Sequence, residues 1–130
     1  MALTKTPQGS NLTYHLFTES ATPLTAVENV RGGPCTLYAI GIENEASSGA
    51  AAWVKAFDHA GAGLSVGTDD LQLLIPIDAQ GGSPLNDELE ILIPGGLSLV
   101  NGLTFFASKE DGSEAAVAPS QNLTTRWMTN

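Results

Sequence analysis

The sequence contains a single cysteine, Cys35, so it cannot form an internal disulfide. Cys35 lies in an apolar run, and free cysteine is among the most buried residue types. We therefore expect a small buried side chain here and not a reactive thiol. A chain of 130 residues is long enough to bury a core without a disulfide or a metal, and this length is typical of one domain.

Basic residues are also scarce, with five lysines and arginines against 14 acidic residues and a formal net charge of −9. Binding to a nucleic-acid backbone requires clustered basic residues, whereas these five are scattered. The same shortage argues against attraction to an anionic membrane surface. We expect no nucleic-acid partner and no membrane partner. The acidity is interpreted as a source of solubility and of repulsion between copies outside specific contacts.

Long hydrophobic runs are missing as well. No stretch approaches the roughly 18 consecutive apolar residues of a membrane-spanning helix. Residues 1–10 are polar, contain Pro7 and Gly9, and show no apolar run of signal-peptide length. We expect a soluble protein made in a cytoplasm, with a flexible arm at residues 1–10 and a single domain at residues 11–130.

Short apolar runs with a period of two, separated by turn residues, are abundant. No window shows the 3.6-residue period of a helix, although a short helix near residues 20–28 remains possible. About eight such strands predict an all-β fold, and specifically an antiparallel β-sandwich of the jelly-roll type. The predicted strands span residues 11–18, 24–31, 35–44, 51–58, 71–77, 88–93, 103–108 and 122–128.

Proline and glycine residues give further information on the position and the ends of some of these strands. Pro76 indicates an edge position or a strand end, and Pro94-Gly95-Gly96 is expected to end the strand at residues 88–93. Residues 97–108 have two interpretations. Asn101-Gly102 forms a type I′ hairpin turn, or a loop precedes a strand at residues 103–108. Residues 115–117 could add a short strand.

Few residues suggest nucleophilic or acid–base chemistry. The only histidines are His15 and His59, too few for a three-ligand catalytic zinc site without further converging ligands. Asp58-His59 could be a general base with its orienting partner, as in a hydrolytic enzyme, but we favour a turn with a solvated histidine. Ser65 lies in a glycine-rich loop between strands and lacks the Gly-x-Ser-x-Gly elbow of a nucleophile.

Acidic and aromatic residues give two further candidates. Asp69-Asp70 and Asp87-Glu88-x-Glu90 could hold calcium or serve glycoside hydrolysis, but the spacing of calcium loops is absent. We interpret the second group as the solvent face of a strand. Trp53 and Trp127 could stack on sugars, but tryptophans among apolar strand neighbours more often lie in a core or an interface. We therefore predict no catalytic, cofactor-binding or metal-binding residues, no cofactor and no enzymatic activity.

Four segments together resemble a known family. They are the runs YAIGIEN at 38–44, AWVKAFD at 52–58, LLIP at 73–76 and IPGGLSLVNGLTFFAS at 93–108. In this order they resemble small β-sandwich structural proteins of tailed phages, most of all head decoration (cement) proteins. The likeness covers roughly residues 25–110 and consists of core and turn patterns, which carry no ligand motif.

The resemblance implies a non-enzymatic virion protein with a jelly-roll-like fold. Copies of it, often homotrimers, would bind the major capsid protein on the outer surface of an icosahedral shell and stabilise it. In that setting the arm at residues 1–10 could order on a neighbouring subunit. The alternative is a phage tail or fibre sandwich module that binds host surface glycans through Trp53, Trp127 or an acidic loop that holds calcium.

Overall fold

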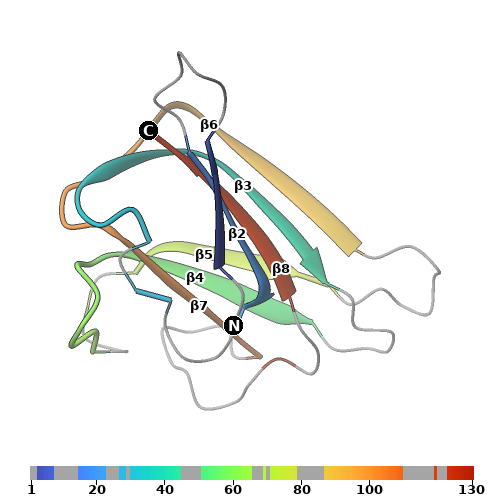
Figure 1. Cartoon of the computed structure of the whole chain (residues 1–130). Coiled ribbons are helices and arrows are strands. Elements are labelled where there is room, and N and C mark those ends of the chain that lie inside the picture. Colours follow the sequence, from blue (N-terminus) through green and yellow to red (C-terminus); the bar gives the residue numbers. More distant parts are fainter. Residues whose placement is uncertain are drawn as a thin grey trace.

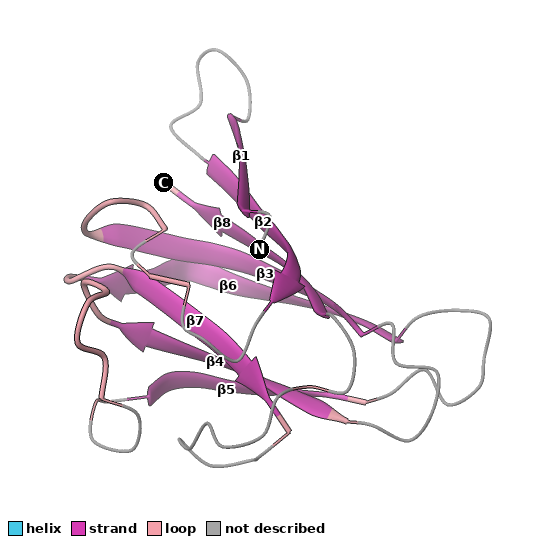
Figure 2. Ribbon diagram, turned by 60° about the horizontal axis from the view of Figure 1, so that its bottom comes forward, coloured by secondary structure: helices cyan, strands magenta, loops and turns pink. Residues whose placement is uncertain are grey.

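The computed structural model describes residues 3–7, 15–22, 27–28, 30–44, 51–65, 69, 71–78, 87–109, 119 and 123–130. These residues form eight β-strands and no helix, which confirms the all-β prediction (Figure 2). Within these ranges, no helix is long and apolar enough to cross a membrane. The strands are β1 (Leu3–Pro7), β2 (His15–Thr22), β3 (Cys35–Asn44), β4 (Ala52–Asp58), β5 (Leu71–Ile77), β6 (Asp87–Leu99), β7 (Leu103–Ser108) and β8 (Leu123–Thr129).

The strands form two antiparallel sheets that pack face to face (Figure 1). The larger sheet has the order β1-β2-β8-β3-β6 and the smaller has the order β5-β4-β7. The pairing is nested, because β2 pairs with β8, β3 with β6 and β4 with β5. The chain from β2 to β8 is thus one long hairpin folded over into two layers, which is the jelly-roll arrangement.

A short segment before β3 completes this nesting. Val27 forms an antiparallel bridge with Phe105 of β7, through backbone hydrogen bonds of 2.7 and 3.1 Å. The amide of Val30 also donates to the carbonyl of Leu103 at 3.0 Å. In the described part of residues 24–31 the predicted strand is therefore reduced to a bridge, which covers an edge of β7 that would otherwise expose unpaired backbone groups.

The core lies between the two sheets and follows the period of two in the sequence. In β8, Leu123, Thr125 and Trp127 share one face and are buried. The rings of Trp127 and Phe105 stack across the sandwich with centroids 4.5 Å apart. Each large aromatic buried in this way removes a large apolar area from water, so these two rings anchor one sheet to the other.

Strand β6 corrects the expectation that Pro94-Gly95-Gly96 ends a strand. The strand continues through these residues to Leu99, and they form a bulge. The register against β3 shifts there, from Ala39↔Leu92 to Leu37↔Leu97. Gly95 and Gly96 both have φ of 79°, a conformation that glycine adopts without steric cost. Turn residues therefore bend this strand without stopping it.

The hairpin interpretation of Asn101-Gly102 is wrong, because β6 and β7 belong to different sheets. The turn instead carries the chain from one layer of the sandwich to the other. The second interpretation, in which a loop precedes the strand Leu103–Ser108, is confirmed. Pro76 lies in β5 at the edge of the smaller sheet, as predicted.

The first residues of the chain also differ from expectation. Leu3–Pro7, within the arm predicted to be flexible, form β1 and pair with β2 along their whole length. Residues 20–22 belong to β2 and Val27 to the bridge, so no helix occurs in the described part of residues 20–28. The short strand predicted at residues 115–117 lies outside the described residues.

The outer face of the smaller sheet is buried around the middle of β4 and β7, whereas Leu74 of β5 on the same face is 39% exposed. Lys55, Phe57 and Phe106 point away from the core, yet at most 1% of each residue is exposed. The rings of Phe57 and Phe106 stack at 5.6 Å, and the Lys55 ammonium lies 5.6 Å from the centre of the Phe106 ring. This lysine therefore packs against an aromatic face and does not reach solvent.

Candidate functional site

Asp58, one of the candidate acid–base residues, holds the turn that joins the two sheets. Its Oδ1 accepts hydrogen bonds from the amides of Asn101 at 2.7 Å and Gly102 at 3.2 Å. Its Oδ2 accepts a third from the amide of Val100 at 3.1 Å. The carboxylate thus provides acceptors for three backbone N–H groups that lie in the turn, outside the strands. Asp58 therefore fixes the crossing turn and does not orient its neighbour His59.

His59 is engaged at both ring nitrogens. Nδ1 accepts a hydrogen bond from the amide of Gly61 at 3.0 Å, so in the neutral ring the proton is on Nε2. Nε2 lies 3.7 Å from Oδ2 of Asp69. The His59 carbonyl also accepts from the hydroxyl of Thr104 at 2.9 Å. These contacts shape the loop after β4, as expected for a histidine in a turn.

Ser65, His59 and Asp69 lie in the same loop but do not form a catalytic triad. The amide of Ser65 donates to Oδ2 of Asp69 at 2.5 Å, and its hydroxyl lies 3.5 Å from the carbonyl of Gly63. A nucleophilic serine needs a free imidazole nitrogen to accept its proton. Here the unprotonated nitrogen of His59 faces the Gly61 amide, so the arrangement closes a loop. The other histidine, His15, lies on β2 in the other sheet.

The acidic candidates separate in space. Asp69 is used within its loop, whereas Glu88 and Glu90 are exposed on the outer face of the larger sheet, as the strand interpretation predicted. Asp70 and the side chain of Asp87 are outside the described residues. Among the described side chains, no group of three histidines, cysteines or acidic residues is placed to hold a metal ion.

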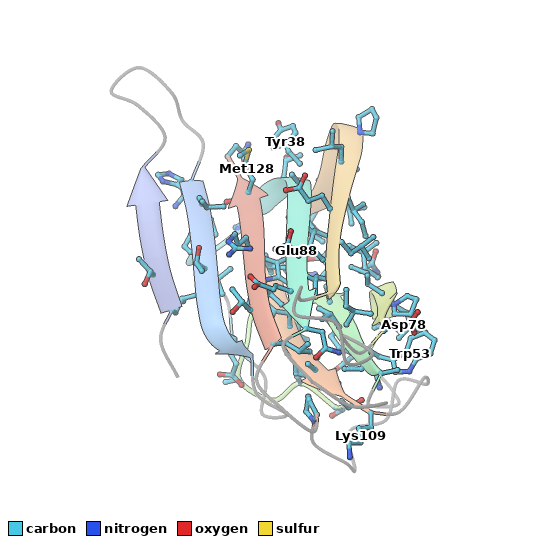
Figure 3. The ribbon with its side chains drawn as sticks, turned by 90° about the vertical axis from the view of Figure 1, so that its right-hand side faces the viewer. Tyr38, Trp53, Asp78, Glu88, Lys109 and Met128 are labelled. Atoms are coloured by element: carbon cyan, nitrogen blue, oxygen red, sulfur yellow. The ribbon has the colours of Figure 1, made fainter. Side chains whose placement is uncertain are left out.

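The two tryptophans occupy different environments. Trp127 is fully buried in the core, where its indole N–H donates to the hydroxyl of Thr125 at 3.0 Å, so it cannot stack on a sugar. Trp53 is partly exposed on the outer face of the smaller sheet, opposite Pro76 and Ser108 (Figure 3). The sugar-platform hypothesis is therefore wrong for Trp127 and rests on Trp53 alone.

Cys35 is buried, as predicted, with 6% of its surface exposed. Burial raises the pKa of its thiol, and the charge of Asp58 acts in the same direction. Arg31 and a hydrogen bond with the backbone of Leu103 oppose this shift without cancelling it. A thiol with a raised pKa forms little thiolate at neutral pH, so Cys35 has the properties of an inert core residue.

The feature that the sequence did not reveal is a groove on the outer face of the larger sheet, the face turned toward the viewer in Figure 3. It has a volume of about 260 Å³. Its floor is β3, where Ala39 and Gly41 carry little or no side chain. Met128 and Arg126 on β8 form one wall, and Leu92 and Glu90 on β6 form the other.

Strand register explains why these residues meet. Leu16, Met128, Ala39 and Leu92 lie directly opposite one another in a row across β2, β8, β3 and β6. Residues opposite one another on one face of an antiparallel sheet have their Cβ atoms about 5 Å apart. Leu92 is 77% exposed, the largest value among the exposed large hydrophobic residues of the described part. The row is therefore an apolar stripe open to solvent.

The next rows, toward the C-terminal end of β3 and the N-terminal end of β6, carry charged residues. Thr18, Arg126, Gly41 and Glu90 form one row, and Glu43 lies opposite Glu88. Arg126 contacts Glu43 at 3.4 Å. Two glutamates opposite each other repel, and a single arginine compensates only part of this repulsion. In Figure 3, Met128 and Glu88 mark the apolar and the acidic parts of this face.

Comparisons with known proteins add no relative. No protein-family model, no curated protein and no solved structure matches this chain.

Proposed function

We propose that this chain is a non-enzymatic structural protein of a phage virion, a decoration subunit that binds the outside of the icosahedral capsid and stabilises it. The proposal starts from the sequence resemblance to head decoration proteins. The single structural observation that carries it is the open, apolar and acidic groove on the larger sheet, which has the character of a protein-binding surface.

The engaged state of the candidate catalytic groups supports the same proposal. Asp58 holds the turn between the sheets, and His59 and Asp69 hold the loop after β4. Each of these side chains has a role in maintaining the fold. A jelly roll also occurs in viral capsid proteins and lectins, so the fold agrees with the proposal without selecting it.

Quantitative mass spectrometry of purified particles tests this function. The virus that encodes the chain is grown and its particles are purified on a density gradient. A decoration subunit is present in a fixed ratio to the major capsid protein, and its removal lowers the temperature at which particles release their DNA. Particles that lack the chain, or that contain it only in traces, would refute the proposal.

The proposal includes assembly as a homotrimer, as the resemblance implies. Light scattering on the purified chain at several concentrations measures its mass. A trimer at every concentration would suit a threefold position on the shell. A monomer that stays monomeric on particles, shown by one isolated density per site in particle images, would contradict the trimer and leave the decoration role intact.

A further inference from the structure

We propose that the groove over β3 is the surface that holds the shell, and that its occupant is an extended segment of the shell protein. This segment carries an apolar side chain and, two and four residues from it in one direction along the chain, lysine or arginine. The inference rests on the proposed function and adds to it the contact surface and the chemistry of the partner.

The shape of the groove selects an extended segment. The groove follows β3 and is bounded by the strands on either side, which lie about 4.8 Å from β3 each. The walls are therefore about 10 Å apart, the width of a single extended chain with its side chains. A Cβ atom added at Gly41 would lie 3.7 Å from the Cβ of Arg126, an ordinary van der Waals contact, so a β-carbon fits on the floor without a clash.

The order of residues along the groove selects the chemistry. The apolar stripe of Leu16, Met128, Ala39 and Leu92 lies beside the charged rows. From Ala39, Gly41 with its neighbour Glu90 is two residues further along β3, and Glu43 with Glu88 is four. At about 3.4 Å per residue these steps correspond to about 7 and 14 Å. Side chains at alternate positions of an extended segment have the same spacing, so one apolar residue and two cations match.

Charge complementarity excludes a second copy of this chain as the occupant. Glu88 and Glu90 line the groove together with Arg126, and Glu43 lies opposite Glu88 at its end. The chain as a whole carries a net charge of −9. Two copies meeting through this face would place carboxylates against carboxylates, which costs free energy. A cationic segment instead gains contacts with both glutamates of β6 and leaves the Arg126–Glu43 pair in place.

The test is binding of purified variants to particles that lack the chain. Three changes each remove one property of the groove. Glu88→Lys with Glu90→Lys reverses its charge, Leu92→Ser removes an apolar wall, and Gly41→Val fills the floor with a residue that suits a strand. Cosedimentation over a range of concentrations gives the Kd of each variant, and circular dichroism verifies that each one is folded.

Two controls match these changes elsewhere on the surface. Glu28→Lys with Asp78→Lys alters the net charge by the same amount at exposed positions that do not line the groove. Val100→Ser removes an exposed apolar side chain, 65% accessible, from the turn between the sheets. We expect each groove variant to bind at least about tenfold more weakly than wild type, which corresponds to about 1.4 kcal/mol, and each control to bind within about twofold.

The outcomes separate the two proposals. Wild-type chain that fails to bind particles refutes the decoration function and the groove inference together. Wild-type binding with groove variants that bind equally well refutes the groove inference alone. Weakening by the charge-reversed pair and its charge-matched control alike would indicate a general electrostatic attraction and would also overturn the specific site. Selective weakening by all three groove variants supports both.

Discussion

The two outer faces of the sandwich are built from similar alternating strands but meet different surroundings. On the smaller sheet, Phe57, Phe106 and even Lys55 are buried. On the larger sheet, Leu92 is 77% exposed and lies beside Glu90, also exposed. Alternation therefore predicts which side chains share a face. It does not predict whether that face is covered, because burial depends on segments distant in sequence.

Truncating one apolar side chain on each outer face gives the largest expected contrast. Phe57→Ala should lower the free energy of unfolding by about 3–5 kcal/mol, because it leaves a cavity in a closed environment. Leu92→Ala should change it by less than about 0.5 kcal/mol, because the side chain is mostly in water. Urea unfolding of both variants measures the difference. Equal losses would show that the two faces are equally packed.

The connection between the faces depends on Asp58. Asp58→Ala should destabilise the protein by about 2 kcal/mol, since three backbone amides lose their acceptor. Asp58→Asn keeps one side-chain oxygen and should lose about half as much. Thermal unfolding of both variants beside wild type tests this order. An alanine variant as stable as wild type would mean that water replaces the carboxylate without cost.

The bulge of β6 offers a matched pair of glycines on the edge of the open face. Both have φ of 79°, but an added Cβ at Gly95 meets nothing within 4 Å, while one at Gly96 would overlap Thr36 and Tyr38. Gly95→Ala should cost about 1 kcal/mol for the left-handed backbone alone. Gly96→Ala should cost about 2–3 kcal/mol, because steric overlap is added. Chemical denaturation gives both values, and equal losses would locate the strain in the backbone only.

Cys35 lies in the core between the two sheets. Titration of its thiol should change the free energy of unfolding less than any of the substitutions above. Because burial raises the pKa of this thiol, the folded state keeps its proton to higher pH than the unfolded state. Its contribution to stability is therefore complete below the unfolded pKa of about 8.5 and is lost as the pH rises through the folded value. The difference in unfolding free energy between wild type and Cys35→Ala, followed from pH 7 to 10, should fall with pH. A flat difference would contradict the shift.

Much of the core could be predicted from the sequence. The alternation of Leu123, Thr125 and Trp127 places them on one face of β8, which the structure shows to be buried, and Pro76 indicated an edge strand. Both signals are local, because they depend on the period of a strand and on the missing proline amide. The jelly-roll topology was also predicted, from the number and spacing of the short strands.

The errors share a physical cause. Pro94-Gly95-Gly96 and Asn101-Gly102 are turn sequences, and each does bend the chain. Whether a bend becomes a bulge, a hairpin or a crossing between sheets depends on which strands accept the flanking backbone groups. For Asn101-Gly102 the outcome depends on the hydrogen bonds to Asp58, and for Pro94-Gly95-Gly96 it depends on the register with β3. Both partners are distant in sequence from the turn residues.

The groove could not be found from the sequence for the same reason. Leu16, Ala39, Leu92 and Met128 are spread over almost the whole chain, and only the pairing of four strands brings them into one row. Ala39 and Gly41 give no functional signal by themselves. They become informative because larger neighbours on β6 and β8 rise on both sides of them.

Site-specific photocrosslinking on assembled particles shows which face of the chain contacts the shell. A benzoylphenylalanine is placed at position 92 in one preparation and at position 100 in another, since both positions are exposed and lie at different places on the surface. After irradiation, we expect a covalent product between position 92 and the major capsid protein, mapped to a segment rich in lysine or arginine, and none from position 100. Crosslinking from position 100 alone, or from neither position on particles that contain the chain, would contradict it.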